Sequence, residues 1–435
     1  MSHLRVAPGG ALIGDIRVPG DKSMSHRSVM FGALAQGQTR VSGFLEGEDA
    51  LATVTAFRAM GITIDGPDKG QLVIHGKGLY GLTAPSDVLD MGNSGTSMRL
   101  LAGILAGQPF DTVLTGDQSL LKRPMGRVMT PLGQMGARIE AEEGGRPPLR
   151  ISGGQSLSGI HYDLPMASAQ VKSSVLLAGL FATGQTSVTE PAPTRDHTER
   201  MLRGFGCPVS LTDGVISVSA GATLRGTGID IPADISSAAF FLVGASIAPG
   251  SDLLLRHVGM NPTRVGVINI LRLMGADIEE VESREVGGEP VADLRVRYAP
   301  LKGIEIPEDQ VPLAIDEFPA LFIAAACAEG TTILSGAEEL RVKESDRIAS
   351  MAEGLTSLGI ANDPRPDGIA IEGGTLGGGT VRTFHDHRIA MSFAIAGLRA
   401  HDTIKILDCD HVSTSFPGFA SLAQSVGLQL EECAE

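Results

Sequence analysis

Carboxylates and cations that could transfer protons and bind anions gather in two stretches of the chain, IDEFP and RVKESDR. The first places Asp316 and Glu317 before a long apolar run. A carboxylate beside cations can act as a general acid or base, so we interpret Asp316 and Glu344 as a candidate acid–base pair. Alternatively, RVKESDR is an exposed helix start with ion pairs three or four residues apart. Its charged residues are Arg341, Lys343, Glu344, Asp346 and Arg347.

Other segments place basic and hydrogen-bonding residues where a helix is expected to begin. Free N–H groups and the dipole at a helix start favour anions, so cations there indicate an anion site. Taken alone, each motif is more typical of a solvated cap or an exposed loop than of a binding site. The residues are Lys22, Ser23 and Arg27 in PGDKSMSHR, Asn93 and Gly95 in GNSGTSMR, Ser168 and Gln170 in MASAQVKSS, and Asp386, His387 and Arg388 in DHR, with Lys122, Arg123, Arg127 and Arg195 in the loops.

These motifs belong to six segments of roughly 40 residues that repeat one order of elements. Each has a polar head, an alanine-rich apolar helix, a turn with glycine, a strand, a loop and a second helix that closes on glycine. The heads are Lys22, Asn93, Ser168, Asp234, Asp316 and Asp386, and the closing glycines are Gly61, Gly136, Gly206, Gly275, Gly359 and Gly427. The fourth head, Asp234, carries no cation and is predicted to cap a structural helix. In the third segment, Gly184 is the expected C-cap of the first helix.

The alternation of helices and strands predicts an α/β protein, and six repeats predict two domains of three repeats each. The break is expected near TGIDIPADIS, with Pro19 and Pro232 marking two crossings between domains. A symmetric arrangement of the repeats would gather cations from several heads and loops around one cleft. These cations are Lys22, Arg27, Arg123, Arg195, Lys343, Arg347 and Arg388.

Composition narrows the class of partner. The formal net charge of −15 argues against nucleic acid or an anionic membrane as the main partner, and the 4% of aromatic residues argues against stacking on bases. No apolar run has the length of a signal peptide or a membrane span, so we expect a cytoplasmic protein. The cysteines are widely spaced, which predicts structural thiols and no metal site. They are Cys207, Cys327, Cys409 and Cys433.

Taken in order, PGDKSMSHR, GNSGTSMR, KRPM, PMASAQVKSS, RVKESDR and DHRIAMSF resemble the 5-enolpyruvylshikimate-3-phosphate (EPSP) synthase family over nearly the whole chain. The resemblance implies the enolpyruvyl transferase fold, an inverse α/β barrel in which each of two domains has three βαβαββ units. One domain would contain residues 1–19 and 233–435, and the other residues 20–232, with the active site in the cleft between them.

The implied reaction moves the enolpyruvyl group of phosphoenolpyruvate to the 5-hydroxyl of shikimate 3-phosphate and releases phosphate, on the route to chorismate. Asp316 would take the hydroxyl proton, while Glu344 and Lys22 would donate and relay the proton at the methylene carbon. No cofactor or metal is implied, and a monomer is expected. By motif, shikimate 3-phosphate would contact Lys22, Ser23, Arg27, Ser168, Ala169, Gln170, Arg195, Asp316 and Lys343. Phosphoenolpyruvate would contact Lys22, Asn93, Gly95, Arg123, Gln170, Glu344, Arg347, His387 and Arg388.

Two positions depart from the better-known branch of that family. Thr414 stands where that branch has lysine, so one phosphoenolpyruvate cation is expected to be missing, and Leu100 stands where proline is usual. MASAQVKSS and TRDHTER resemble instead the second branch, which includes glyphosate-tolerant enzymes. Some tolerant members have alanine where this chain has Gly95.

Two alternatives remain open at the level of sequence. The sister transferase that acts on UDP-N-acetylglucosamine shares the fold, but it commonly has a catalytic cysteine in the loop that reads GDQSLLKRPM here. A non-catalytic repeat scaffold would repeat one interaction pattern, whereas these heads differ in acid, base and cation content.

Overall fold

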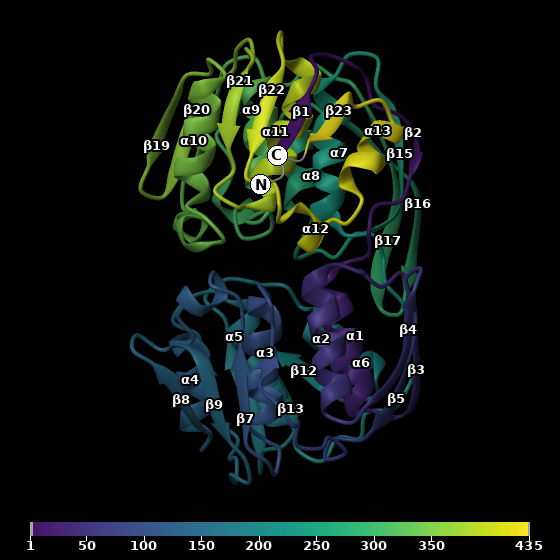
Figure 1. The fold of residues 1–435 in the computed structure, drawn as a ribbon, viewed down its shortest axis with the longest axis vertical. Coiled ribbons are helices and arrows are strands. Elements are labelled where there is room, and N and C mark those ends of the chain that lie inside the picture. The colour runs from purple at the N-terminus through teal and green to yellow at the C-terminus, as the bar shows by residue number, and fades with distance from the viewer. Residues whose placement is uncertain (1–2, 434–435) are drawn as a thin grey trace. The chain divides into compact units, whose positions relative to one another are not determined.

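The structure is a computed structural model, and it describes residues 3–433. Helices and strands alternate along this range, as predicted for an α/β protein (Figure 1). The helices are α1 (Lys22–Leu34), α2 (Glu48–Ala59), α3 (Gly95–Leu105), α4 (Gly126–Gln134), α5 (Ala169–Gly179), α6 (His197–Gly204), α7 (Ile235–Ile247), α8 (Gly266–Leu273), α9 (Phe318–Ala326), α10 (Arg347–Ser357), α11 (His387–Ala396), α12 (Val412–Ser415) and α13 (Phe419–Ser425). Short 3₁₀ helices are η1 (Leu120–Lys122), η2 (Glu308–Gln310), η3 (Glu338–Val342) and η4 (Gly397–Arg399).

The strands are short and lie between these helices. They are β1 (His3–Val6), β2 (Ile13–Ile16), β3 (Gln36–Ser42), β4 (Thr63–Asp68), β5 (Gln71–Lys77), β6 (Leu89–Asp90), β7 (Thr112–Thr115), β8 (Arg138–Glu142), β9 (Arg146–Ser152), β10 (His161–Asp163), β11 (Gln185–Thr189), β12 (Val209–Thr212), β13 (Val215–Ser219), β14 (Gly228–Asp230), β15 (Asp252–Gly259), β16 (Asp277–Val286), β17 (Glu289–Arg297), β18 (Thr331–Leu334), β19 (Asn362–Arg365), β20 (Gly368–Glu372), β21 (Gly379–Arg382), β22 (Ile404–Leu407) and β23 (Leu430–Cys433).

All six predicted heads lie at the start of a helix, within two residues of its first position. At α1, α3, α5, α7 and α11, the side chain of the N-cap residue accepts a hydrogen bond from a backbone N–H of the first turn, which satisfies one donor that the helix leaves free. These N-caps are Asp21, Ser94, Ser168, Asp234 and Asp386. At α9, Glu317 is the N-cap residue, but its side chain makes no such bond.

The closing glycines all have a positive φ, between 82° and 116°, which glycine adopts without strain. They follow α2, α4, α6, α8, α10 and α13, so the second helix of each repeat ends as predicted. The prediction that Gly184 is the C-cap of α5 is wrong, because α5 ends at Gly179. The N–H of Phe181 donates to the carbonyl of Ala178, a tight turn that ends the helix before Gly184 is reached.

The chain divides into two compact units. The first unit includes the segment up to Pro19, Pro232–Glu285 and the chain from Glu289 onward, and the second includes Gly20–Ile231 with Val286–Gly288. The sequence predicted domain boundaries after residues 19 and 232. It did not predict that Val286–Gly288, the turn between β16 and β17, would group with the second unit. The outermost predicted residues, 1–2 and 434–435, lie outside the described range.

One strand pattern recurs in the three sheets of the second unit and in the sheet β21-β22-β1-β23 of the first. In the second unit the strand orders are β14-β3-β5-β4, β6-β7-β9-β8 and β10-β11-β13-β12. In each, the first pair is parallel and the next two are antiparallel. The first unit has β16-β17-β15-β2, β18-β20-β19 and β21-β22-β1-β23. The start of the chain therefore completes two sheets of this unit, since β2 pairs parallel with β15 and β1 pairs with β22 and β23.

Each unit has its own hydrophobic core. In the second unit α3 packs against α1 and α5, and in the first unit α7, α9 and α11 pack on one another. These are the first helices of the repeats, so their starting residues are brought into contact within each unit. Across residues 3–433, no helix combines the length and apolarity that a bilayer crossing requires.

The cysteine thiols fit the structural role predicted for them. Cys207 and Cys409 are buried, and burial raises the pKa of the Cys207 thiol to about 11 and that of Cys409 to about 12. Both thiols therefore stay protonated and unreactive near neutral pH.

Candidate active site

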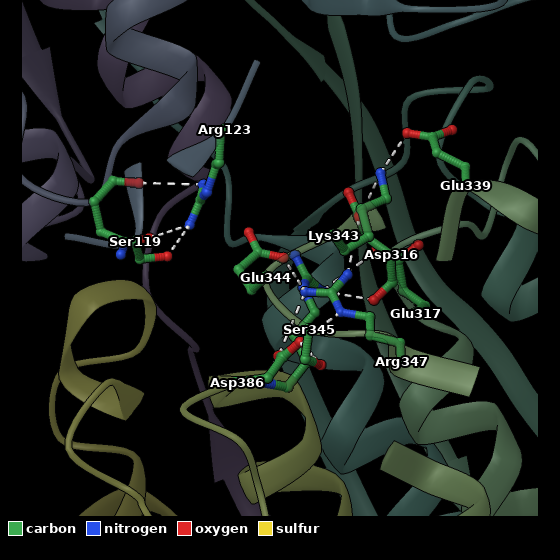
Figure 2. Close-up of polar contacts among 12 residues, drawn as sticks. Ser119, Arg123, Asp316, Glu317, Glu339, Lys343, Glu344, Ser345, Arg347 and Asp386 are labelled. Carbon is green, nitrogen blue, oxygen red and sulfur yellow. Dashed lines mark hydrogen bonds and ion pairs between the residues drawn. The ribbon is translucent and has the colours of Figure 1, made fainter. Parts of the chain in front are cut away.

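Arg347, the first residue of α10, lies at the centre of a charge cluster in the first unit (Figure 2). Its Nε lies 2.9 Å from Asp386, its Nη1 lies 3.3 Å from Asp316 and its Nη2 lies 2.6 Å from Glu344. Arg347 is only 1% exposed. Burial alone would lower the pKa of its guanidinium, but the carboxylates of Asp386, Glu344 and Asp316 raise it above its ordinary value. Arg347 thus remains charged and orders three carboxylates.

Asp316 faces a second cation as well. The Nζ of Lys343 lies 3.4 Å from Asp316 Oδ1 and 2.5 Å from Glu339 Oε1. The side chain of Asp316 is 15% exposed, and that of Glu344 is 31% exposed, so both candidate proton-transfer groups can be reached from solvent. The structure therefore brings together the predicted base, the predicted acid and two of the predicted cations.

The start of α11 joins the same cluster. Asp386 is fully buried and accepts from the backbone N–H of Arg388, while Ser345 Oγ donates to it over 3.1 Å. Arg388 Nη1 donates to the backbone carbonyl of Asp316 over 3.0 Å. His387 is buried at the first position of α11. Asp386 is therefore an anchor for Arg347 and for the helix start, and Arg388 is the cation that α11 adds.

Sequence reasoning missed a cation in the fourth repeat. Arg264, 3% exposed, lies 3.0 Å from Asp234 Oδ1 and 3.9 Å from Glu317 Oε1. Glu317 also accepts from Ser236 Oγ and lies 3.8 Å from Arg388 Nη1. Asp234 caps α7 as predicted, and its head carries no cation, but the loop of this repeat supplies one that the sequence interpretation did not consider. The repeat register could have found it, since Arg123, Arg195, Arg264 and Arg347 all precede or begin the second helix of a repeat.

In the second unit, Lys22 begins α1 and forms an ion pair with Asp49 of α2. Arg27, one turn later, is 3% exposed. Its Nε donates to Thr198 Oγ1 over 2.7 Å, and its Nη2 donates to Ser173 Oγ over 3.0 Å. Arg27 therefore ties α1 to α5 and α6, and it could offer an anion only the hydrogens that these bonds leave.

Asn93 and Arg123 form a second contact set, also drawn in part in Figure 2. Arg123 Nη2 donates to Asn93 Oδ1 over 2.6 Å and to Ser119 Oγ over 3.2 Å. Gly95 begins α3, and a Cβ at this position would lie 2.8 Å from Arg99 Nη1 and 3.4 Å from Arg123 Nη1. The absence of a side chain at Gly95 thus leaves room for both guanidinium groups at the helix start.

The third repeat contributes polar groups at the start of α5. Ser168 is its N-cap, Ala169 its first residue and Gln170 its second. Gln170 Oε1 accepts from Arg99 Nη1 over 2.7 Å, and its Nε2 donates to Thr96 Oγ1 over 2.9 Å. These bonds join the starts of α3 and α5. Ser23 lies one residue after Lys22 in α1, and Arg195 lies just before α6.

Thr414, one of the two positions that depart from the better-known branch, faces inward. Thr414, in α12, is buried, and its hydroxyl donates to the backbone carbonyl of His411 over 2.7 Å. Thr414 therefore caps a turn of the backbone. Among residues 3–433, no group of three or more His, Cys, Asp or Glu side chains is arranged to hold a metal ion.

Helix starts that carry arginine, lysine and carboxylate side chains are suited to chemistry on anionic substrates. A family model described as EPSP synthase (3-phosphoshikimate 1-carboxyvinyltransferase) matches residues 6–422. The chain is 67% identical over 429 residues to the 3-phosphoshikimate 1-carboxyvinyltransferase of Alkalilimnicola ehrlichii, a match that covers 98% of this chain and 96% of the relative. For the relative of the same name from Methylococcus capsulatus, the identity is 66% and the coverages are 98% and 97%.

A solved structure, the EPSP synthase of Acinetobacter baumannii, has a TM-score of 0.92 with this chain at 59% identity, and the match covers 100% of both chains. The chain belongs to the EPSP synthase family. The resemblance drawn from the sequence motifs and the predicted α/β fold are both confirmed.

Proposed function

We propose that this chain transfers the enolpyruvyl group of phosphoenolpyruvate to the 5-hydroxyl of shikimate 3-phosphate, giving 5-enolpyruvylshikimate 3-phosphate and phosphate. Membership of the EPSP synthase family supports this reaction. The observation that carries it is the cluster of Asp316 with Lys343 and Arg347, to which Glu344 is bound. Such a cluster combines a base, an acid and cations for anionic substrates.

In the proposed mechanism, Asp316 removes the proton of the 5-hydroxyl while the hydroxyl oxygen forms a bond to C2 of phosphoenolpyruvate. Glu344, with Lys22 as a relay, donates a proton to the methylene carbon C3, which becomes a methyl group. In the second step a proton leaves C3, the double bond re-forms and the C2–O bond to phosphate breaks. The proton lost from C3 returns to Glu344 and offsets the one that Glu344 donated. The proton that Asp316 took from the hydroxyl leaves with the released phosphate.

The cations bind the substrates. Arginine suits planar carboxylate and phosphate groups because its guanidinium donates two parallel hydrogen bonds. We propose that Arg123, Arg347 and Arg388 hold phosphoenolpyruvate, with Asn93, Gly95, Gln170 and His387 beside it. Shikimate 3-phosphate would contact Lys22, Ser23, Arg27, Ser168, Ala169, Gln170, Asp316 and Lys343, with Arg195 on its phosphate. Residues of both units would then act on the same substrates, in a protein that works as a cytoplasmic monomer in the route to chorismate and aromatic amino acids.

The direct test is phosphate release with phosphoenolpyruvate and one of two acceptors, shikimate 3-phosphate or UDP-N-acetylglucosamine. We expect release only with shikimate 3-phosphate. Release only with the nucleotide sugar would replace this proposal by the sister reaction, and no release with either acceptor would leave the chain without transferase activity.

A further inference from the structure

Lys172, the lysine of MASAQVKSS, is a cation near a helix start whose side chain points into the protein. It lies in α5 and is 0% exposed. Its Nζ lies 2.9 Å from Glu190 Oε2, 2.8 Å from Glu199 Oε1 and 3.5 Å from the backbone carbonyl of Thr194. An ammonium group has three hydrogens, and here three protein acceptors surround it. Lys172 is therefore not a group that binds substrate itself.

Two of these acceptors belong to the loop that joins β11 to α6. Glu190 is the first residue after β11, and Thr194 lies four residues further on. The hydroxyl of Thr194 also donates to the carboxylate of Glu190. The loop is thus closed around Lys172, and the residue that follows its second attachment point is Arg195.

We propose that Lys172, Glu190 and Thr194 are positioning residues that hold Arg195 against the phosphate of shikimate 3-phosphate. The inference rests on the proposed function, because it needs that phosphate as the ligand of Arg195. A guanidinium binds phosphate well only when its direction is fixed, and a loop that is free to move would have to be ordered at each binding event. The buried ammonium fixes this loop before the substrate arrives and so favours a phosphorylated acceptor over an unphosphorylated one.

The charges of this cluster allow a matched pair of variants. Lys172 has two carboxylate partners, so either can be removed and the lysine still keeps one. Removing the lysine would instead leave two buried carboxylates unpaired, which is strongly destabilising. Glu190→Met removes the ion pair between the loop and Lys172 and leaves only the 3.5 Å contact with the Thr194 carbonyl, whereas Glu199→Met removes only the contact with α6. The two variants have the same net charge, so they differ mainly in the attachment of the loop.

The test is calorimetric titration of both variants and the unmodified protein with shikimate 3-phosphate and with shikimate, which lacks the phosphate. For Glu190→Met, we expect the Kd of shikimate 3-phosphate to rise about tenfold and that of shikimate to stay within about twofold. For Glu199→Met, both constants should stay within about twofold. Hydrogen exchange of the backbone amides in residues 191–196 should become faster in Glu190→Met only.

Three results would overturn the inference. The first is unchanged binding of shikimate 3-phosphate by Glu190→Met. The others are an equal rise in the Kd of both ligands for Glu190→Met, or an equal rise in the Kd of shikimate 3-phosphate for both variants. If Glu190→Met does not fold, Thr194→Val is the deciding variant, because it removes only the hydroxyl contact with Glu190. It should raise the Kd of shikimate 3-phosphate about threefold. An unchanged Kd of shikimate 3-phosphate for that variant would also overturn the inference. If the unmodified protein neither binds nor turns over shikimate 3-phosphate, the proposed function itself fails, and the inference fails with it.

Discussion

At the scale of single residues, Asp316 has the surroundings of a proton acceptor that must stay charged until its substrate is bound. The ammonium of Lys343 and the guanidinium of Arg347 stabilise its negative charge from two sides. Arg347 also binds Glu344, so one buried cation sets the distance between the proposed base and the proposed acid. These contacts suggest that the two proton transfers depend on one rigid centre.

Replacing Asp316 by asparagine should therefore remove the base and keep the shape. We expect kcat to fall by about 10²- to 10⁴-fold, while the KM of each substrate changes much less, because the amide can still contact Lys343 and the substrate hydroxyl. Steady-state kinetics with both substrates would measure this. The control is Glu339→Gln, which removes the other carboxylate beside Lys343 and should leave kcat within about threefold. A kcat near that of the unmodified protein in Asp316→Asn would refute the assignment.

Sequence reasoning located the residues of this cluster but not the direction in which every side chain points. The repeat register placed Asp316, Arg347 and Arg388 at helix starts, and neighbouring helix starts meet within one unit. Arg27 and Lys172 have the same kind of place in the sequence, yet their side chains bind distant protein groups. Two side-chain partners of Arg27, Ser173 and Thr198, lie 146 and 171 residues away along the chain, and no local period encodes such contacts.

At the scale of elements, a buried polar network joins α1, α2 and α3. His26 of α1 is fully buried, and its Nδ1 lies 2.8 Å from Thr53 Oγ1 and 3.2 Å from Ser97 Oγ. Thr53 and Ser97 are 2.7 Å apart, and Ser97 is also 2.7 Å from the N-cap Ser94. The starts of α1 and α3 carry proposed substrate contacts, so this network fixes the helices that present them.

This network predicts a pH-dependent stability. Burial, and then the charges of Lys22 and Arg27, lower the pKa of His26 well below its ordinary value of 6.5. Below pH 6.5 the unfolded chain takes up a proton at His26 while the folded protein does not. The free energy of unfolding must therefore decrease as the pH is lowered. We expect His26 to contribute a slope of about 1.4 kcal/mol per pH unit below about pH 6.5, and none above it.

Urea unfolding between about pH 7.5 and about pH 5 would measure this slope. His26→Gln should unfold with a flatter dependence than the unmodified protein. The control is His161→Gln, which replaces an exposed histidine of the same unit and should not flatten it. Identical slopes for His26→Gln and the unmodified protein would exclude His26 as the group responsible.

At the scale of the whole molecule, two of the points where the chain passes from one unit to the other are joined by a hydrogen bond. Pro19 ends the first segment of one unit, Pro232 begins its second segment, and the N–H of Asp234 donates to the carbonyl of Pro19 over 2.9 Å. Proline fixes φ at both crossings, which restricts bending there. Gly20 follows directly, and a Cβ at that position would lie 1.7 Å from the carbonyl oxygen of Gly43, so no larger residue fits. Within the first unit, the ends of these two crossings are therefore held together.

The proposed function requires substrate contacts from both units, Lys22, Arg123 and Arg195 from one and Lys343, Arg347 and Arg388 from the other. If these cations face one substrate, as the proposed function requires, shikimate 3-phosphate offsets their mutual repulsion and the units draw together. We expect small-angle scattering to give a smaller radius of gyration at saturating shikimate 3-phosphate, close to the roughly 22 Å of a compact chain of this length. Shikimate, which lacks the phosphate, should give a smaller decrease at the same occupancy. An unchanged radius, at a concentration where calorimetry detects full binding, would contradict closure of the units on the substrate.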